Sequence, residues 1–141
     1  MIISLFMQTG MKLTIILMVI ASLLPWLCSV LAKASAGFRF AKHNQDPRGF
    51  LADSTGIAAR FNHAQANGYE TLPVFLAAVL IAIYTFVPMA VVNLLAAGYV
   101  LFRIGYIASY AANLGMLRSV NWLLSMLCVL GLFTFAFWFG I

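Results

Sequence analysis

The stretch Thr71–Phe102 reads TLPVFLAAVLIAIYTFVPMAVVNLLAAGYVLF and contains no charged residue. A helix needs about 20 apolar residues to cross the hydrocarbon core of a bilayer, so this stretch is too long for a single crossing. Pro88 interrupts it, and proline is favoured in the first turn of a helix. We therefore predict two membrane-spanning helices that meet in a turn near Val87.

Two further charge-free runs, Leu13–Ala32 and Ser119–Ile141, lie on either side of this pair. A membrane barrel would require many short segments of alternating polarity, which these runs are not. The sequence therefore predicts an all-α fold, an integral membrane four-helix bundle made by the single domain 1–141. The expected helices cover about residues 10–34, 52–86, 88–114 and 118–140.

The composition excludes several classes of protein. Hydrophobic residues make up 65% of the 141 residues and charged residues only 8%, against about 45–50% and about 25% in soluble domains. A soluble enzyme and a disordered chain are therefore excluded. The net charge of +5 does not indicate a nucleic-acid partner, because the basic residues separate apolar runs instead of gathering on one wet face. Membrane lipids are the expected surroundings.

The basic residues predict the orientation of the chain. Most of them fall in the segment from Lys33 to Arg60, which contains the loop between the first two predicted helices: Lys33, Arg39, Lys42, Arg48 and Arg60. Cytoplasmic loops of membrane proteins collect Lys and Arg. We expect this loop to be cytoplasmic, both termini to lie on the opposite side, and the turn before Arg118 to be cytoplasmic again.

A cleaved signal peptide is the alternative interpretation of the N-terminal region, because Ala34-Ser35-Ala36 is similar to a cleavage site. The apolar run that begins at Leu13 is longer than the 7–15 residues typical of a signal peptide. We therefore favour a membrane-spanning helix.

Three of the predicted helices carry a stripe of polar residues. In the 52–86 helix the spacings are 3, 4 and 3, which places the stripe within an arc of about 80°. Polar groups at membrane depth are costly, so the stripes should face one another or a neighbouring subunit. The stripes consist of Arg60, His63, Asn67 and Glu70; of Tyr99, Arg103, Tyr106, Tyr110 and Asn113; and of Arg118, Asn121, Trp122 and Ser125.

Glu70 and Arg103 should lie at the same depth. Counted from the turn, Glu70 is about 24 Å and Arg103 about 22 Å along their helices. We therefore predict a buried structural ion pair between them. Loss of one partner would leave the other charge buried without compensation.

A polar cluster with two cations is predicted closer to the cytoplasmic end of the helices. It contains Asn67, Tyr106 and Tyr110 near the cations Arg60 and Arg118. This arrangement suits an anionic ligand that enters from the cytoplasm. The alternative is that the tyrosines belong to an interfacial aromatic belt and that the arginines extend to lipid headgroups.

Neither the histidines nor the cysteines indicate a metal site. His43 and His63 have no second metal-binding residue at helical spacing, and we expect no metal. Cys28 and Cys128 both lie within apolar runs and do not form a disulfide framework or a ligand set.

The polar stripes resemble those of a known family. The segment Arg60–Glu70 is similar to the R-x-x-x-A-[HQ]-x-N-x-x-E signature of the MAPEG family, membrane-associated proteins in eicosanoid and glutathione metabolism. Asn44–Leu51 resembles the N-x-x-P-R segment of its bacterial members. Arg103–Tyr110 resembles the family's R-x-x-Y-x-x-x-Y pattern, and Leu117–Val120 resembles its Arg-Ser start of the fourth helix.

The resemblance implies a homotrimer with a ligand site between subunits, and a bacterial inner-membrane location. By position it implies that glutathione, as co-substrate, is bound by Arg60, Asn67 and Glu70 and by Tyr106 and Tyr110 of helix 88–114. It implies a catalytic role for Arg118 and Ser119 in stabilising the glutathione thiolate, which agrees with the effect of a cation on a thiol.

The leading hypothesis is a glutathione S-transferase or peroxidase that acts on lipophilic electrophiles or lipid hydroperoxides. Two alternatives stay open. One is a non-catalytic membrane protein whose stripes serve subunit assembly, and the other is a carrier for a small anion.

Overall fold

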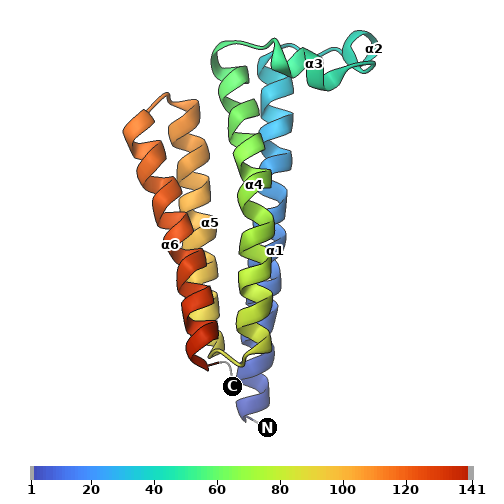
Figure 1. The fold of residues 1–141 in the computed structure, drawn as a ribbon. Coiled ribbons are helices and arrows are strands. Elements are labelled where there is room, and N and C mark those ends of the chain that lie inside the picture. Colours follow the sequence, from blue (N-terminus) through green and yellow to red (C-terminus); the bar gives the residue numbers. More distant parts are fainter. Residues whose placement is uncertain (1, 140–141) are drawn as a thin grey trace.

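The structure, a computed structural model, describes the backbone of residues 2–139 and the side chains of residues 10–139. Within this range the chain is all-α (Figure 1). Four long helices and two short ones follow one another along the described chain: α1 (Ile2–Ser35), α2 (Phe40–His43), α3 (Pro47–Ala52), α4 (Gly56–Tyr84), α5 (Met89–Ala111) and α6 (Gly115–Phe139).

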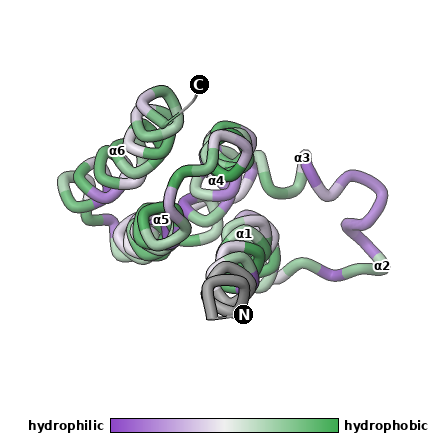
Figure 2. The backbone as a smooth tube through the Cα atoms, turned by 90° about the horizontal axis from the view of Figure 1, so that it is seen from below, coloured by the Kyte–Doolittle hydropathy of each residue, from purple (hydrophilic) through white to green (hydrophobic). Residues whose placement is uncertain are grey.

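The long helices form two antiparallel pairs, α1 with α4 and α5 with α6 (Figure 1). α5 also packs against α1 and α4, and α6 also packs against α4. The two pairs diverge toward the end of the bundle at which α2 and α3 lie (Figure 1). α2 and α3 themselves extend sideways from the α1–α4 pair, away from α5 and α6 (Figure 2).

All four long helices are long and apolar enough to cross a membrane, the span in α1 covering Gly10–Ser35. Large apolar side chains such as Leu23, Leu94 and Leu130 are exposed on the outside of the bundle. In a soluble protein such a surface would aggregate, whereas lipid tails match it. The protein is an integral membrane protein.

The loop between the first two spans contains more structure than the sequence predicted. The 52–86 helix was expected to begin at Ala52, but residues 47–52 form the separate helix α3. Asp46 caps α3 by accepting a hydrogen bond from the backbone N–H of Gly49 (2.9 Å), and Pro47 occupies its first turn. α4 then begins at Gly56, whose φ of +62° changes the direction of the chain between α3 and α4.

The helix predicted at about residues 88–114 also ends earlier than expected. α5 ends at Ala111 because Asn113 adopts a left-handed conformation (φ 60°). The N–H of Leu114 then donates to the carbonyl of Ser109 (2.9 Å), which closes the helix end. Asn113 therefore lies outside the stripe to which the sequence assigned it, and α6 begins three residues before Arg118.

The apolar core lies toward the end of the bundle away from α2 and α3. At the edge of this core nearest α2 and α3, the rings of Phe75 and Tyr99 stack, with a centroid distance of 3.9 Å and an interplanar angle of 4°. Small residues of α4 such as Ala78 and Ala82 are fully buried there and allow the helices to approach closely. This core holds the helices that carry the polar stripes.

Candidate functional site

A hydrogen-bonded relay joins α5 to α4 in the middle of the bundle. Arg103 is 3% exposed, and its Nη1 donates to Asn67 Oδ1 (2.9 Å). Asn67 Nδ2 donates in turn to Glu70 Oε2 (3.2 Å). The asparagine amide can act in both directions because it carries an acceptor oxygen and a donor nitrogen.

This relay corrects the predicted buried pair of Glu70 and Arg103. The two residues do lie on facing helices, but Asn67 connects them and Glu70 is exposed on the outer surface of the chain. The reason is local geometry. Three residues at about 100° each turn Glu70 about 60° further than Asn67 from the buried face of α4, so Asn67 meets the arginine and Glu70 faces outward.

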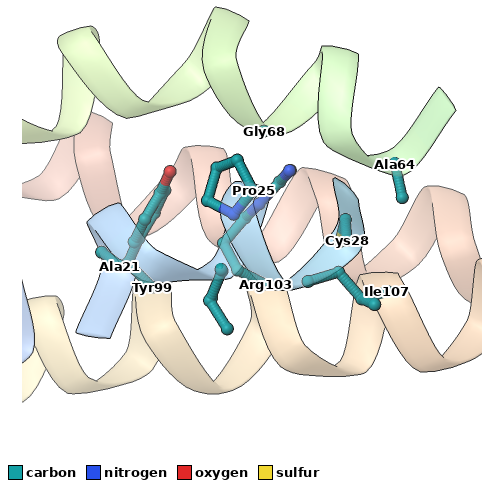
Figure 3. Close-up of a pocket in the computed structure, with 9 residues that line it drawn as sticks. Ala21, Pro25, Cys28, Ala64, Gly68, Tyr99, Arg103 and Ile107 are labelled. Atoms are coloured by element: carbon teal, nitrogen blue, oxygen red, sulfur yellow. The ribbon is translucent and has the colours of Figure 1, made fainter. Parts of the chain in front are cut away.

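The Arg103 guanidinium is further held by its neighbours on α1 and α5. It lies over the Tyr106 ring, with Cζ 4.4 Å from the ring centroid. A cavity of about 10 Å³, room for one water molecule, lies beside it and is lined in part by Pro25 and Cys28 of α1 (Figure 3). Figure 3 shows the Arg103 side chain extending from α5 toward α4 past Pro25.

A second layer of aromatic and cationic side chains lies closer to the end of the bundle. The Tyr106 and Tyr110 rings meet edge to face with centroids 5.5 Å apart. The Arg118 guanidinium lies over the Tyr110 ring, with Cζ 4.7 Å from its centroid, and the His63 ring is 6.2 Å from the same ring. Arg118 of α6 is thus linked through two tyrosines of α5 to Arg103.

Arg60 and Ser119 have different surroundings. Arg60 Nε donates to the carbonyl oxygen of Ala111 (3.1 Å), one of the carbonyls at the C-terminus of α5 that lack a helical partner. A cation is favourable there. The Ser119 hydroxyl is exposed and donates to the carbonyl of Gly115 in its own helix (3.2 Å).

The structure therefore brings most of the predicted site residues together. We call the connected group the polar cluster; it contains Asn67, Glu70, Arg103, Tyr106, Tyr110 and Arg118. Arg60 lies at the same end of the bundle but binds the end of α5. Ser119 points to its own backbone and is not tied to the cluster by these contacts.

The sequence did not identify two supports of the cluster. Tyr99 donates its hydroxyl to Thr71 Oγ1 (3.2 Å), and Thr71 donates to the Asn67 carbonyl (3.1 Å), which fixes α4 beside the relay. Gly68 lets α1 approach, because a Cβ at this position would be 2.9 Å from Pro25 Cγ. A glycine and a threonine beside the stripe, both on the buried face of α4, were the available signals.

Chemically, the polar cluster offers cations and hydroxyl groups to a negatively charged ligand. Arg118 is half-buried and lies on the face of an aromatic ring, so its charge stays available to an anion. Glu70 offers the opposite charge and is bound by the Asn67 amide. Within the described residues, no group of three or more His, Cys, Asp and Glu side chains could hold a metal ion.

A search of curated proteins finds no match to this sequence. The sequence profile of the MAPEG family matches residues 13–138, which is nearly the whole chain and includes all four spans and the polar cluster. The four apolar spans and the resemblance of the α4 stripe to the family signature agree with this match. The chain belongs to the MAPEG family.

Proposed function

We propose that this protein is a homotrimeric, glutathione-dependent transferase or peroxidase of a bacterial inner membrane. Its second substrate is a lipophilic electrophile or a lipid hydroperoxide. The observation that carries the proposal is the polar cluster, in which Arg118, Tyr110 and Glu70 are connected at membrane depth in a MAPEG protein.

The residues present fit the charges of glutathione. This peptide carries two carboxylates, one ammonium group and a thiol. In our proposal Arg60 binds a carboxylate of the peptide, and the Glu70 carboxylate pairs with its ammonium group. The Asn67 amide forms hydrogen bonds with the peptide between these two ends. Tyr106 and Tyr110 add hydroxyl groups, and Ser119 adds one at the edge of the site.

Arg118 is the proposed catalytic residue. A nearby cation stabilises a thiolate relative to a thiol, and the thiolate is the nucleophilic form. The Tyr110 ring holds the guanidinium in one position, so less ordering remains to occur when the thiolate binds. The sulfur of bound glutathione forms a bond to an electrophile as the leaving group departs. With a hydroperoxide it takes the outer oxygen and releases the alcohol, and a second glutathione reduces the sulfenic acid to the disulfide with loss of water.

The exposure of Glu70 and His63 supports a second copy of the chain as partner. Both side chains lie within the α4 span and both are exposed in the single chain. Ionisable groups at membrane depth face protein or water in preference to lipid. In our proposal the neighbouring subunit covers this face of α4 and completes the site.

Calorimetry with glutathione on the detergent-purified protein tests the proposal. We expect heat of binding for the wild type, a weaker affinity for Arg60→Leu, and unchanged affinity for the control Arg39→Leu, an exposed cation of the α1–α2 loop that is not part of the proposed site. Absence of heat at millimolar glutathione in a folded wild-type protein would refute the glutathione-dependent reaction.

One observation favours a non-catalytic alternative. Arg103 and Asn67 satisfy each other, and Arg60 binds the end of α5, so part of the polar stripe is used for packing within one chain. In this alternative the remaining polar residues hold subunits together. A protein that assembles normally but shows no heat with glutathione would support it.

A further inference from the structure

A second hollow lies on the other side of α4 from the polar cluster. We call it the lateral groove: it is bounded by α1, α3 and α4 and has a volume of about 430 Å³. That is enough for a small ligand or a lipid headgroup. Its lining consists of Ser29, Lys33, Pro47, Arg48, Leu51, Asn62, Gln65, Ala66 and Tyr69.

The charge of the lateral groove is positive. Lys33, in the last turn of α1, and Arg48, in the first turn of α3, both line it. None of the described lining residues is acidic. The nearby carboxylate of Asp46 is engaged as the cap of α3, where it accepts from the Gly49 N–H. Two cations and several neutral donors therefore face the same hollow.

The groove is built from elements that are already fixed. The Lys33 ammonium lies over the Phe38 ring, 5.0 Å from its centroid. Leu51 is 5% exposed, and its carbonyl accepts a hydrogen bond from Asn62 Nδ2 (3.3 Å), which ties α3 to α4. α3 lies beside the α1–α4 pair (Figure 2), at the end of the bundle where α1 ends and α4 begins (Figure 1).

Polarity changes along the groove in the direction of the membrane normal. Lys33 lies at the end of the span, and Ser29 lies one turn, about 6 Å, deeper. On the same side of α1, Val30 is 62% exposed beside Ser29, and Trp26, three residues deeper than Ser29, is 66% exposed. A ligand that matches this surface has an anionic head and an apolar tail.

We propose that the lateral groove binds an anionic phospholipid. The headgroup phosphate lies between Lys33 and Arg48, with Asn62 and Gln65 as further donors. One acyl chain runs along Trp26 and Val30 of α1. This site does not depend on the proposed reaction with glutathione, because it lies on the other side of α4 and uses none of the polar cluster.

Competition between lipids in native mass spectrometry tests the proposal. The delipidated wild type is mixed with equal amounts of phosphatidylglycerol and phosphatidylcholine in detergent, and the bound ratio is measured. We expect the wild type to prefer phosphatidylglycerol. Lys33→Gln and Arg48→Gln should each lower this preference about fivefold, as expected for loss of one cation near an anionic headgroup.

The matched control is the double variant Arg39→Gln/Lys42→Gln, which removes two cations of the same loop that do not line the groove. We expect it to keep the wild-type preference. If it loses the preference as fully as Lys33→Gln/Arg48→Gln does, the loop acts by its net charge and the groove is not the site.

Two measurements need only the wild type, so they test the proposal even if a variant does not fold. Dioleoyl phosphatidylglycerol should bind more tightly than the dihexanoyl form, because the longer chain reaches Trp26. Displacement of the lipid by inorganic phosphate, but not by chloride of equal ionic strength, would indicate a soluble anion and overturn the proposal.

If Lys33→Gln/Arg48→Gln instead weakens glutathione binding or subunit assembly and keeps the lipid preference, the groove faces a second subunit and the proposal is wrong.

Discussion

Asn67 is the residue on which the interior of the bundle depends most directly. It accepts from the buried Arg103 guanidinium and donates to Glu70, and its backbone carbonyl accepts from Thr71. A buried cation that loses its acceptor retains the full cost of leaving water. One neutral amide therefore decides whether Arg103 is tolerated at this depth.

Asn67→Leu should lower the free energy of unfolding by about 1.5–3 kcal/mol, the usual contribution of a hydrogen bond to a charged group. The measurement is SDS-induced unfolding in mixed micelles followed by circular dichroism. The matched control is Asn62→Leu, which loses a neutral hydrogen bond at the edge of α4 and should cost less. Equal stability of Asn67→Leu and the wild type would contradict the role of the relay.

Gly68 determines how closely α1 and α4 approach. An added methyl group would lie 2.9 Å from Pro25 Cγ, and a proline ring cannot move aside as a flexible chain would. We expect Gly68→Ala to cost about 1–3 kcal/mol, as overpacking usually does. Gly115→Ala is the control, because nothing lies within 4 Å of the added group. Thermal unfolding that affects both variants equally would disprove close packing at Gly68.

At the scale of elements, the α4–α5 turn and the α5–α6 turn each end the preceding helix with a residue in the left-handed conformation, but the two residues differ in type. Asn113 and Phe86 both adopt left-handed backbone conformations, with φ of 60° and 59°. Asparagine tolerates this conformation, whereas a bulky side chain is strained in it. The α4–α5 turn therefore contains a strained residue and the α5–α6 turn does not.

Phe86→Gly should stabilise the bundle by about 1 kcal/mol by relieving this strain. Asn113→Gly should have a smaller effect, and the comparison separates strain from the general effect of glycine. Differential scanning calorimetry in detergent measures both. A lower transition temperature for Phe86→Gly would show that the exposed ring contributes more than the strain costs.

The accuracy of the sequence predictions differs between the long helices and their ends. The four spans were predicted from charge-free runs, and the facing stripes from helical periodicity, because both patterns extend over many residues. Asn113 was wrongly assigned to a stripe, because a residue at helical spacing can equally end a helix. The sequence also did not predict that Asn67 lies between Arg103 and Glu70, because depth counted along a helix does not give the direction of each side chain. The cytoplasmic orientation of the loop remains a prediction.

At the scale of the whole molecule, Glu70 and His63 are exposed on the outer face of α4, and ionisable groups at membrane depth face protein or water in preference to lipid. We expect native mass spectrometry of the protein in mild detergent to give three copies. Glu70→Leu should weaken this assembly if the neighbouring subunit supplies its polar contacts. A monomer that binds glutathione, or an assembly strengthened by Glu70→Leu, would show that this face is exposed to lipid.

In our proposal the polar cluster stabilises an anion, and in particular a thiolate, beside Arg118. The most direct test is the ultraviolet difference absorbance of the glutathione thiolate, recorded with wild type, Arg118→Ala and the control Arg39→Ala at equal, saturating occupancy. We predict a thiolate band for the wild type and Arg39→Ala and its loss in Arg118→Ala. A band of unchanged size in Arg118→Ala, or no band in a wild type that binds glutathione, would contradict the account.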